Sequence, residues 1–183
     1  MNLDKISSAL TIWDIVKVAF GFLVLFFGFL IIFWRSIKVF FRLGRNLGRK
    51  VFVFCPPGGN RNSGTNKNME RELIVLRNSG YFEVPKQPIT DFNSIDVVDI
   101  EKAGVIVLGY HQEMKNFNEF VDLVRHVGKP LIIYTFELGY QLKEEHRKKV
   151  KGYKWYVLSS MPLRLVSDLF AVMASYKYEQ ERN

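Results

Sequence analysis

Apolar residues are distributed unevenly along this chain of 183 residues. From Val18 to Trp34 there are 17 residues without a charge. With residues 15–17 added, the run is about 20 residues long, roughly 30 Å of helix, which matches the hydrocarbon core of a bilayer. After residue 49 the pattern changes to short apolar runs separated by amphipathic segments. The pattern predicts a transmembrane and juxtamembrane segment at 1–49 and a separate domain at 50–183.

Two other interpretations of the apolar run are a cleavable signal peptide and a buried core helix. A signal peptide has a basic start, a shorter apolar region and a small-residue cleavage site, whereas bulky Phe, Trp and Arg side chains stand after this run. A core helix would need a large partner to cover the eight Phe residues between Phe20 and Phe41. Trp13 and Trp34 flank the run where aromatic belts lie in membrane proteins. We therefore expect a single transmembrane helix.

Basic residues are concentrated on the C-terminal side of the run. Only Lys5 and Lys17 precede it, and six Lys and Arg residues follow within residues 35–50. The positive-inside rule places that side in the cytoplasm. The single cysteine, Cys55, fits a reducing compartment. The expected location is the cell inner membrane, crossed once, with the C-terminal domain in the cytoplasm.

The stretch after the run is amphipathic if it is helical. Basic residues recur every three or four positions, and an apolar series with the same spacing is displaced by two residues, about 200° on a helix. The basic face suits a lipid bilayer with anionic headgroups. The apolar face suits a seam between copies of the chain in a homo-oligomer. Both interpretations stay open, and the seam would be formed by Leu30, Phe33, Ile37 and Phe40.

The region from residue 50 onward alternates strand-like and helix-like segments. The strand-like runs are continuously apolar, which is typical of a parallel sheet covered on both faces. We predict strands at 50–55, 81–84, 104–110, 129–135 and 155–160, and helices at 69–78, 95–103, 117–127, 141–150 and 161–178. The expected fold class is α/β, a three-layer flavodoxin- or Rossmann-like domain with a five-stranded, mainly parallel sheet.

Charge and cysteine content narrow the function classes. The formal net charge is +8, but residues 1–50 hold eight Lys and Arg against two Asp, so most of the excess lies outside the domain. We therefore expect no direct DNA binding by the domain. One cysteine excludes an intrachain disulfide and a cysteine cluster, and the three His residues lack metal-ligand spacing. No metal or cofactor is expected.

The loop at 55–68, after the first predicted strand, is rich in Gly, Asn, Ser and Thr and leads into a helix. Backbone N–H groups, small hydroxyls and a helix N-terminus together favour an anion such as a phosphate. The loop is neither a Walker A motif nor a GxGxxG fingerprint. A plain surface loop is the alternative. As nucleotide-binding residues we select Gly58, Gly59, Asn60, Arg61, Ser63 and Thr65.

A second loop, 109–115, follows the central strand and should lie at the same rim. Tyr110 would stack on a base, and His111 would contact phosphate. Thr135 and Ser159 end later strands at this rim, where their hydroxyls serve a ligand or cap the next helices.

No catalytic residue is assigned. The chain has no GxSxG elbow and no HExxH motif. Cys55 is interpreted as a buried structural thiol rather than a nucleophile. Glu113 and Glu119 are carboxylates near the expected rim, but neither has an obvious partner in the sequence.

The stretch VIVLGYHQEMKNFNEFVDLVRHVGKPLIIY, residues 105–134, resembles the middle of a TIR-type domain, where a strand and helix precede a Gly-Lys-Pro-led strand. TIR enzymes that cleave NAD use a Glu early in that helix, and Glu119 is the nearest match. The resemblance implies a membrane-anchored NAD hydrolase.

The overall plan, one transmembrane helix before a small Rossmann-like domain, is similar to CRISPR-associated membrane proteins that carry a CARF domain. That resemblance implies an antiviral effector in which a nucleotide second messenger, such as a cyclic oligoadenylate, causes the transmembrane helices to oligomerise and permeabilise or depolarise the membrane. It is the leading hypothesis. Besides the NAD hydrolase, a non-catalytic scaffold that binds a protein partner through Lys143–Lys151 remains an alternative.

Overall fold

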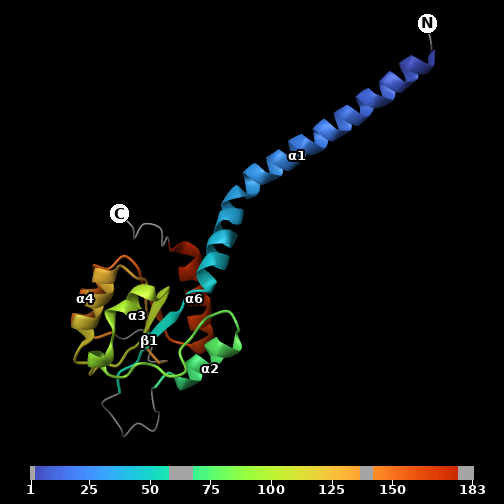
Figure 1. Cartoon of the computed structure of the whole chain (residues 1–183). Coiled ribbons are helices and arrows are strands. Elements are labelled where there is room, and N and C mark those ends of the chain that lie inside the picture. Colours follow the sequence, from blue (N-terminus) through green and yellow to red (C-terminus); the bar gives the residue numbers. More distant parts are fainter. Residues whose placement is uncertain (1–2, 58–67, 137–141, 177–183) are drawn as a thin grey trace. The chain divides into compact units, whose positions relative to one another are not determined.

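The computed structural model describes residues 3–57, 68–136 and 142–176, with the side chains of Arg35 and of residues before Trp13 excluded. The chain forms two compact units, Met1–Phe41 and Arg42–Asn183. The boundary lies inside the first helix, eight residues earlier than the division at residue 49 that the sequence pattern predicts (Figure 1).

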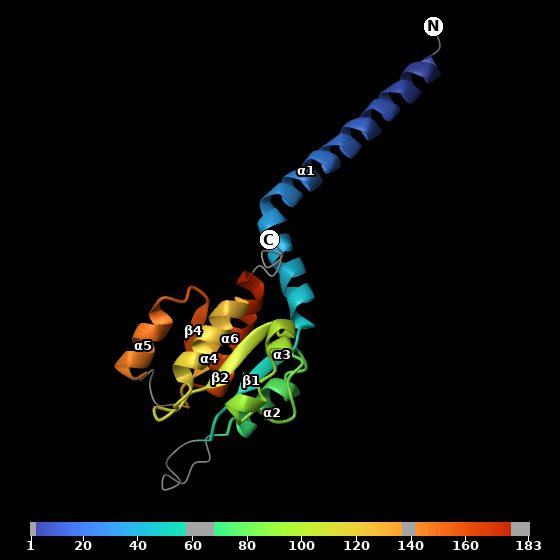
Figure 2. The same ribbon diagram turned by 60° about the vertical axis from the view of Figure 1, so that its left-hand side comes forward.

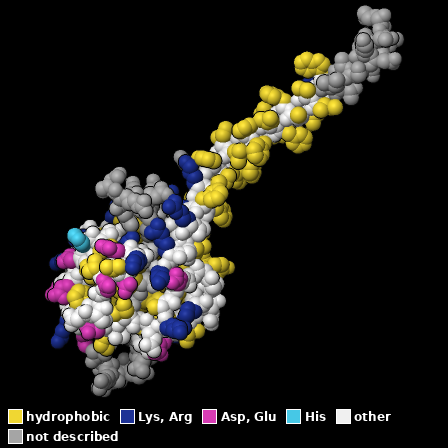
Figure 3. Space-filling model, viewed as in Figure 1, with side chains coloured by type: hydrophobic (Ala, Val, Ile, Leu, Met, Phe, Trp, Pro, Cys, Tyr) yellow, Lys and Arg dark blue, Asp and Glu magenta, His cyan; other side chains and the backbone are white. Residues whose placement is uncertain are grey.

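Helix α1 spans Leu3–Leu47. Its stretch Trp13–Trp34 is 22 residues long with a mean hydropathy of 2.7 and is nowhere buried within the chain, so it is long and apolar enough to cross a membrane. Figure 3 shows apolar side chains along this part of the helix. The stretch after the apolar run is helical, because α1 ends 13 residues after Trp34.

The second unit contains a four-stranded parallel sheet. Its strands are β1 (Val51–Phe54), β2 (Val105–Gly109), β3 (Leu131–Tyr134) and β4 (Tyr156–Ser159), and they lie in this order across the sheet (Figure 2). Every residue of the first three strands is buried. The predicted α/β class and parallel pairing are confirmed, and each strand lies within its predicted run.

The second predicted strand, Tyr81–Val84, does not form. Instead, the chain from Glu83 to Ile89 makes two isolated parallel bridges to the free edge of β1, at Lys50 and at Phe54. Pro85 and Pro88 lie between these bridges, and proline cannot donate a hydrogen bond to a ladder. The segment therefore touches the edge at two points without pairing along it.

Helices cover both faces of the sheet (Figure 1). On one face pack α2 (Glu70–Asn78) and α6 (Pro162–Ser175), against the odd-numbered side chains of β1 and β2. On the other face pack α3 (Val97–Lys102), α4 (Phe117–Val127) and α5 (Glu144–Lys151), against the even-numbered ones. The bounds of α4 are those that its apolar spacing predicts, and the other helices lie within three residues of prediction wherever their ends are described.

The last turn of α1 belongs to the second unit and closes the end of α6. The Asn46 side chain is buried, and its Nδ2 donates to the Met173 carbonyl oxygen over 2.6 Å. Arg42 Nη1 donates to the next carbonyl, Ala174, over 3.4 Å. The last carbonyls of a helix have no partner within it, so these side chains cap α6. The partly buried Leu43 and Leu47 pack on the same core.

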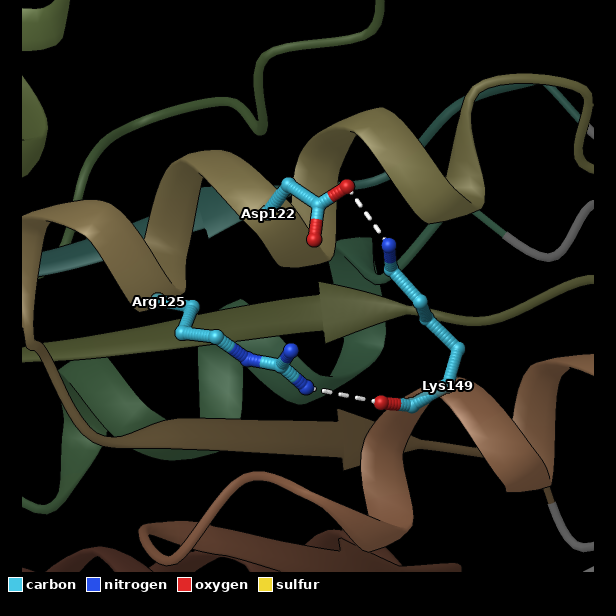
Figure 4. Close-up of polar contacts among 3 residues, drawn as sticks. All are labelled: Asp122, Arg125 and Lys149. Carbon is cyan, nitrogen blue, oxygen red and sulfur yellow. Dashed lines mark hydrogen bonds and ion pairs between the residues drawn. The ribbon is translucent and has the colours of Figure 1, made fainter.

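Helix α5 is fixed to α4 by polar contacts (Figure 4). Lys149 Nζ lies 2.6 Å from the Asp122 carboxylate, and Arg125 Nη2 donates to the Lys149 carbonyl over 2.8 Å. His146 and Val150 of α5 face the core and are buried. The charged run Lys143–Lys151, the expected scaffold surface, therefore uses part of one face to pack within the domain.

Candidate functional site

The site lies where the chain leaves two neighbouring strands in opposite directions. Strands β1 and β2 pair along their whole length. The helix that follows β1, α2, packs on one face of the sheet, and the helix that follows β2, α4, packs on the other. Helices that diverge in this way leave a crevice outside the carboxyl ends of the strands, which is where ligands bind in open α/β sheets.

A pocket of about 590 Å³ occupies this end of the sheet. Three segments of the chain build it: the end of β1 with the two prolines after it, the residues that follow the edge contact at Ile89, and the loop after β2. Its lining residues are Phe54, Pro56, Pro57, Thr90, Asp91, Phe92, Glu113, Met114, Lys115 and Asn116.

The pocket is apolar at its base and polar at its rim. The Phe54 and Phe92 rings lie 6.3 Å apart between centroids, and Phe54 and Met114 are buried. Asp91, Glu113 and Lys115 are exposed. An apolar surface with a few polar groups around it is the usual composition of a small-molecule site.

Asp91 is held in place by the backbone around it. Two residues earlier, Ile89 donates to the Val53 carbonyl over 2.9 Å and accepts from the Cys55 N–H over 2.8 Å. Asp91 itself is the N-cap of a short 3-10 helix, Phe92–Ser94, where its Oδ1 accepts from the Asn93 N–H over 3.0 Å. The edge contact thus places the carboxylate at the carboxyl end of β1.

The structure gives Tyr110 a place in the core rather than in the pocket lining. It is 3% exposed, and its ring packs edge-on against Phe117 and His146. Its hydroxyl accepts from the Lys143 N–H over 3.0 Å and lies 2.9 Å from His146 Nδ1. The hydroxyl thus has a partner on each side, a backbone N–H and an imidazole nitrogen. Tyr110 is therefore buried and is not among the pocket's lining residues, and its stacking on a base stays a prediction.

Burial shifts both groups of this pair. Burial raises the pKa of the Tyr110 hydroxyl above its ordinary value, although the hydrogen bond from the Lys143 backbone N–H acts in the opposite direction and lowers the pKa. Burial also lowers the pKa of His146, helped by the nearby charge of Lys143 and opposed by Glu145. Burial therefore favours the neutral form of His146 in the folded state.

The other selected rim residues that the structure describes do not line the pocket. His111 is half-buried and stacks on Phe136, with ring centroids 5.2 Å apart. Thr135 and Ser159 are buried at the ends of β3 and β4, and Thr135 Oγ1 donates to the Ser159 carbonyl over 3.3 Å. The selected loop residues Gly58, Gly59, Asn60, Arg61, Ser63 and Thr65 lie outside the described residues.

Cys55 is buried directly behind the pocket, as expected for a structural thiol. Burial, together with the charge of Glu72, raises its pKa to about 12. The thiol is therefore protonated at neutral pH and is not a nucleophile.

The two carboxylates considered at the rim differ in position. Glu113 lines the pocket, whereas Glu119 is exposed in the first turn of α4 and does not. In the ranges that the structure describes, no three His, Cys, Asp or Glu side chains gather closely enough to hold a metal ion.

Sequence reasoning missed Asp91, Phe92, Lys115 and Asn116 as lining residues. Asp91 and Phe92 come from the segment between the predicted strand 81–84 and the predicted helix 95–103, where no site residue was predicted. The available signal was the sequence Pro-Ile-Thr-Asp-Phe-Asn-Ser, in which Asp two residues before Asn indicates a local side-chain cap.

Comparison with known proteins yields no relative. No protein-family model, curated protein or solved structure matches the chain. Function is therefore inferred from the site and the helix alone.

Proposed function

We propose that this protein is a membrane-anchored effector whose cytoplasmic domain binds a nucleotide second messenger, such as a cyclic oligoadenylate, and thereby drives its transmembrane helices to oligomerise and permeabilise the membrane in antiviral defence. The observation that carries the proposal is the presence, in one chain, of a pocket at the carboxyl ends of β1 and β2 and of a long apolar helix. In this proposal the domain binds the nucleotide, and the helix permeabilises the membrane.

The domain is proposed to be a reduced three-layer flavodoxin- or Rossmann-like fold. In a flavodoxin-like sheet the second strand lies on the outer side of the first, with the strand order 2-1-3-4-5. The segment from Glu83 to Ile89 contacts the same side of β1 in parallel. It takes the place of that strand, with two prolines in the way of full pairing.

The size and lining of the pocket suit a nucleotide. A volume of about 590 Å³ is in the range of small-molecule sites. The apolar base next to Phe92 suits a purine ring, and the polar rim suits sugar and phosphate. Lys115 is the cation in this lining, and the Gly- and Asn-rich loop that precedes α2 is the proposed source of further phosphate contacts.

Coupling to the membrane is proposed to pass through the end of α1. Asn46 and Arg42 tie this helix to the carbonyls of α6, so α1 is part of the sensor domain at its C-terminal end. One helix cannot enclose a channel, so conduction requires several copies. The ligand favours the oligomer only as far as it binds that state more tightly.

The membrane arrangement follows from charge. The basic residues after the apolar stretch support a cytoplasmic location for the domain and a contact with anionic headgroups, and the protein is proposed to cross the cell inner membrane once. The apolar series Leu30, Phe33, Ile37 and Phe40 is the proposed seam between copies. The side chains of Phe33 and Phe40 are 43% and 74% exposed on α1 and available to a neighbour.

Binding is tested on the purified full chain in lipid nanodiscs. Thermal shift and calorimetry are run with NAD, ADP-ribose, cyclic di-, tri- and tetra-adenylate, and nucleotide turnover is followed in parallel. We expect one intact nucleotide to bind and to raise the unfolding temperature. The variant Lys115→Glu should weaken binding at least about tenfold, whereas Lys102→Glu, an exposed lysine of α3 outside the pocket lining, should not.

Other outcomes separate the alternatives. Consumption of NAD that is lost on Glu119→Gln would instead establish the hydrolase. Binding of no nucleotide by the wild type would contradict the proposal and favour the scaffold.

A further inference from the structure

The charge of the pocket rim distinguishes the parts of a nucleotide. Two carboxylates, Asp91 and Glu113, and one cation, Lys115, belong to the lining. A carboxylate accepts hydrogen bonds from hydroxyl groups but repels a phosphate at contact distance. The carboxylates of the rim therefore suit the sugar rather than the phosphates of a ligand.

Asp91 is the better placed of the two. Two residues before it, Ile89 donates to the Val53 carbonyl and accepts from the Cys55 N–H, and the Asp91 Oδ1 is fixed by the Asn93 N–H. No contact of Oδ2 with another side chain is found within the parts of the chain that the structure describes. A carboxylate that is already fixed through one oxygen can accept hydrogen bonds from ligand hydroxyls through the other. Binding then costs less conformational entropy than it would with a mobile side chain.

We propose that Asp91 is a ribose-recognition residue, whose carboxylate accepts a hydrogen bond from the 2′-hydroxyl of an adenine ribonucleotide, and from the 3′-hydroxyl where that group is free, while the base lies over the Phe92 side of the pocket. The inference rests on the proposed function and adds its ligand class: ribonucleotides with a free 2′-hydroxyl, in preference to 2′-deoxynucleotides. The location supports it, because a carboxylate at the end of the strand beside the first strand contacts the ribose in dinucleotide-binding sheets.

The test compares matched ligands on the full chain in nanodiscs. The probes are ADP and 2′-deoxy-ADP, and cyclic triadenylate and its 2′-deoxy counterpart, measured by calorimetry. The wild type should bind each ribonucleotide about tenfold more tightly than its deoxy partner, the scale of a lost hydrogen bond to a charged group. A substitution that only destabilises the fold would lower the affinities for the ribonucleotide and for its deoxy partner alike. Loss of the ribose contact would change the ratio of the two affinities.

Variants locate the contact. Asp91→Asn should reduce the ratio of ribonucleotide affinity to deoxynucleotide affinity to about twofold or less. Asp91→Glu, which keeps the carboxylate, should have a ratio between those of Asp91→Asn and the wild type. Glu101→Gln, which removes an exposed carboxylate of α3 outside the lining, should leave the ratio unchanged. If Asp91→Asn does not fold, the affinity ratios of the wild type and of Asp91→Glu still test whether the carboxylate contacts the ribose.

Each contrary result overturns a different statement. Equal wild-type affinities within both pairs would overturn ribose recognition and leave nucleotide binding in place. A ratio that collapses in Glu113→Gln but persists in Asp91→Asn would overturn the role of Asp91. If neither these probes nor the wider nucleotide panel bind the wild type, the inference falls together with the proposed function.

Discussion

Asn46 of α1 and Met173 of α6, 127 residues apart in the sequence, are joined by a 2.6 Å hydrogen bond from the asparagine Nδ2 to the methionine carbonyl oxygen. Both residues belong to the second compact unit. The bond is buried, so neither group has water as a substitute partner. The helix that carries the apolar stretch therefore ends as a structural part of the α/β domain rather than as a free linker.

Removal of this cap should destabilise the domain. Asn46→Ala leaves the Met173 carbonyl buried without its donor, at a cost of about 1–3 kcal/mol. Thermal and urea unfolding of the α/β domain measure the loss. Asn78→Ala, at an exposed position at the end of α2, is the matched control and should stay within about 0.5 kcal/mol of wild type. Equal effects of the two variants would contradict the capping role.

Soluble fragments should depend on where they begin. A fragment from Arg42 keeps both caps of α6 and the packing of Leu43 and Leu47, whereas a fragment from Lys50 loses all four. We expect the longer fragment to be more stable by about 3 kcal/mol or more. Urea unfolding of the two fragments is the measurement. Equal midpoints and slopes would show that the end of α1 contributes nothing to the domain.

Gly109 at the end of β2 should not tolerate a side chain. A Cβ there would lie 2.6 Å from Cys55 Sγ and 3.0 Å from Met69 Sδ. Gly109→Ala should therefore cost about 1–3 kcal/mol by overpacking. In the background Cys55→Ala, which removes the nearest atom, the cost of the same substitution should fall. An unchanged cost in that background, measured as a double-mutant cycle, would show that Cys55 is not the obstacle.

Stability should fall in mild acid because of His146. Its pKa is lowered in the folded state, so the unfolded chain binds a proton first as the pH falls below about 6.5. Stability contributed by the neutral ring is present above that pH and decreases below it until the folded-state pKa is reached. The free energy of unfolding, measured between pH 7.5 and 5.5, should decrease less in His146→Gln than in wild type. Identical pH dependence would exclude this histidine as the cause.

The proposed seam should be needed for conduction and not for binding. Phe33→Lys combined with Ile37→Lys should abolish ligand-dependent ion flux in proteoliposomes while nucleotide affinity stays within about twofold, because no residue of the pocket changes. The control places the same two charges at Ile32 and Val39, about 200° around the helix from Leu30 and Ile37. Equal loss of flux in both variants would contradict a specific seam.

The sequence pattern was sufficient for the parts of the fold that local physics determines. The apolar spacing of α4 predicted both of its ends, and continuous apolar runs predicted the four parallel strands. It failed at Tyr81–Val84, because the β-favouring residues there are followed by Pro85 and Pro88, which interrupt the ladder along β1.

The site was harder to predict than the fold. Glu113 was noted from the sequence, but Asp91 reaches the pocket only through the edge contact of Ile89 with β1, which no local pattern specifies. Tyr110 stands at a strand end, where an exposed aromatic is expected. Tyr110 is instead buried, and its hydroxyl has a hydrogen-bond partner in His146, 36 residues later in the sequence.

The most direct measurement is ion or dye flux from liposomes that contain the full chain, with and without nucleotide. We expect one nucleotide of the panel to cause flux through the wild-type protein at concentrations near the dissociation constant of that nucleotide. We also expect that Lys115→Glu shifts this response to at least about tenfold higher concentration while Lys102→Glu does not. Flux that is independent of every nucleotide, or absent although a nucleotide binds, would contradict the account.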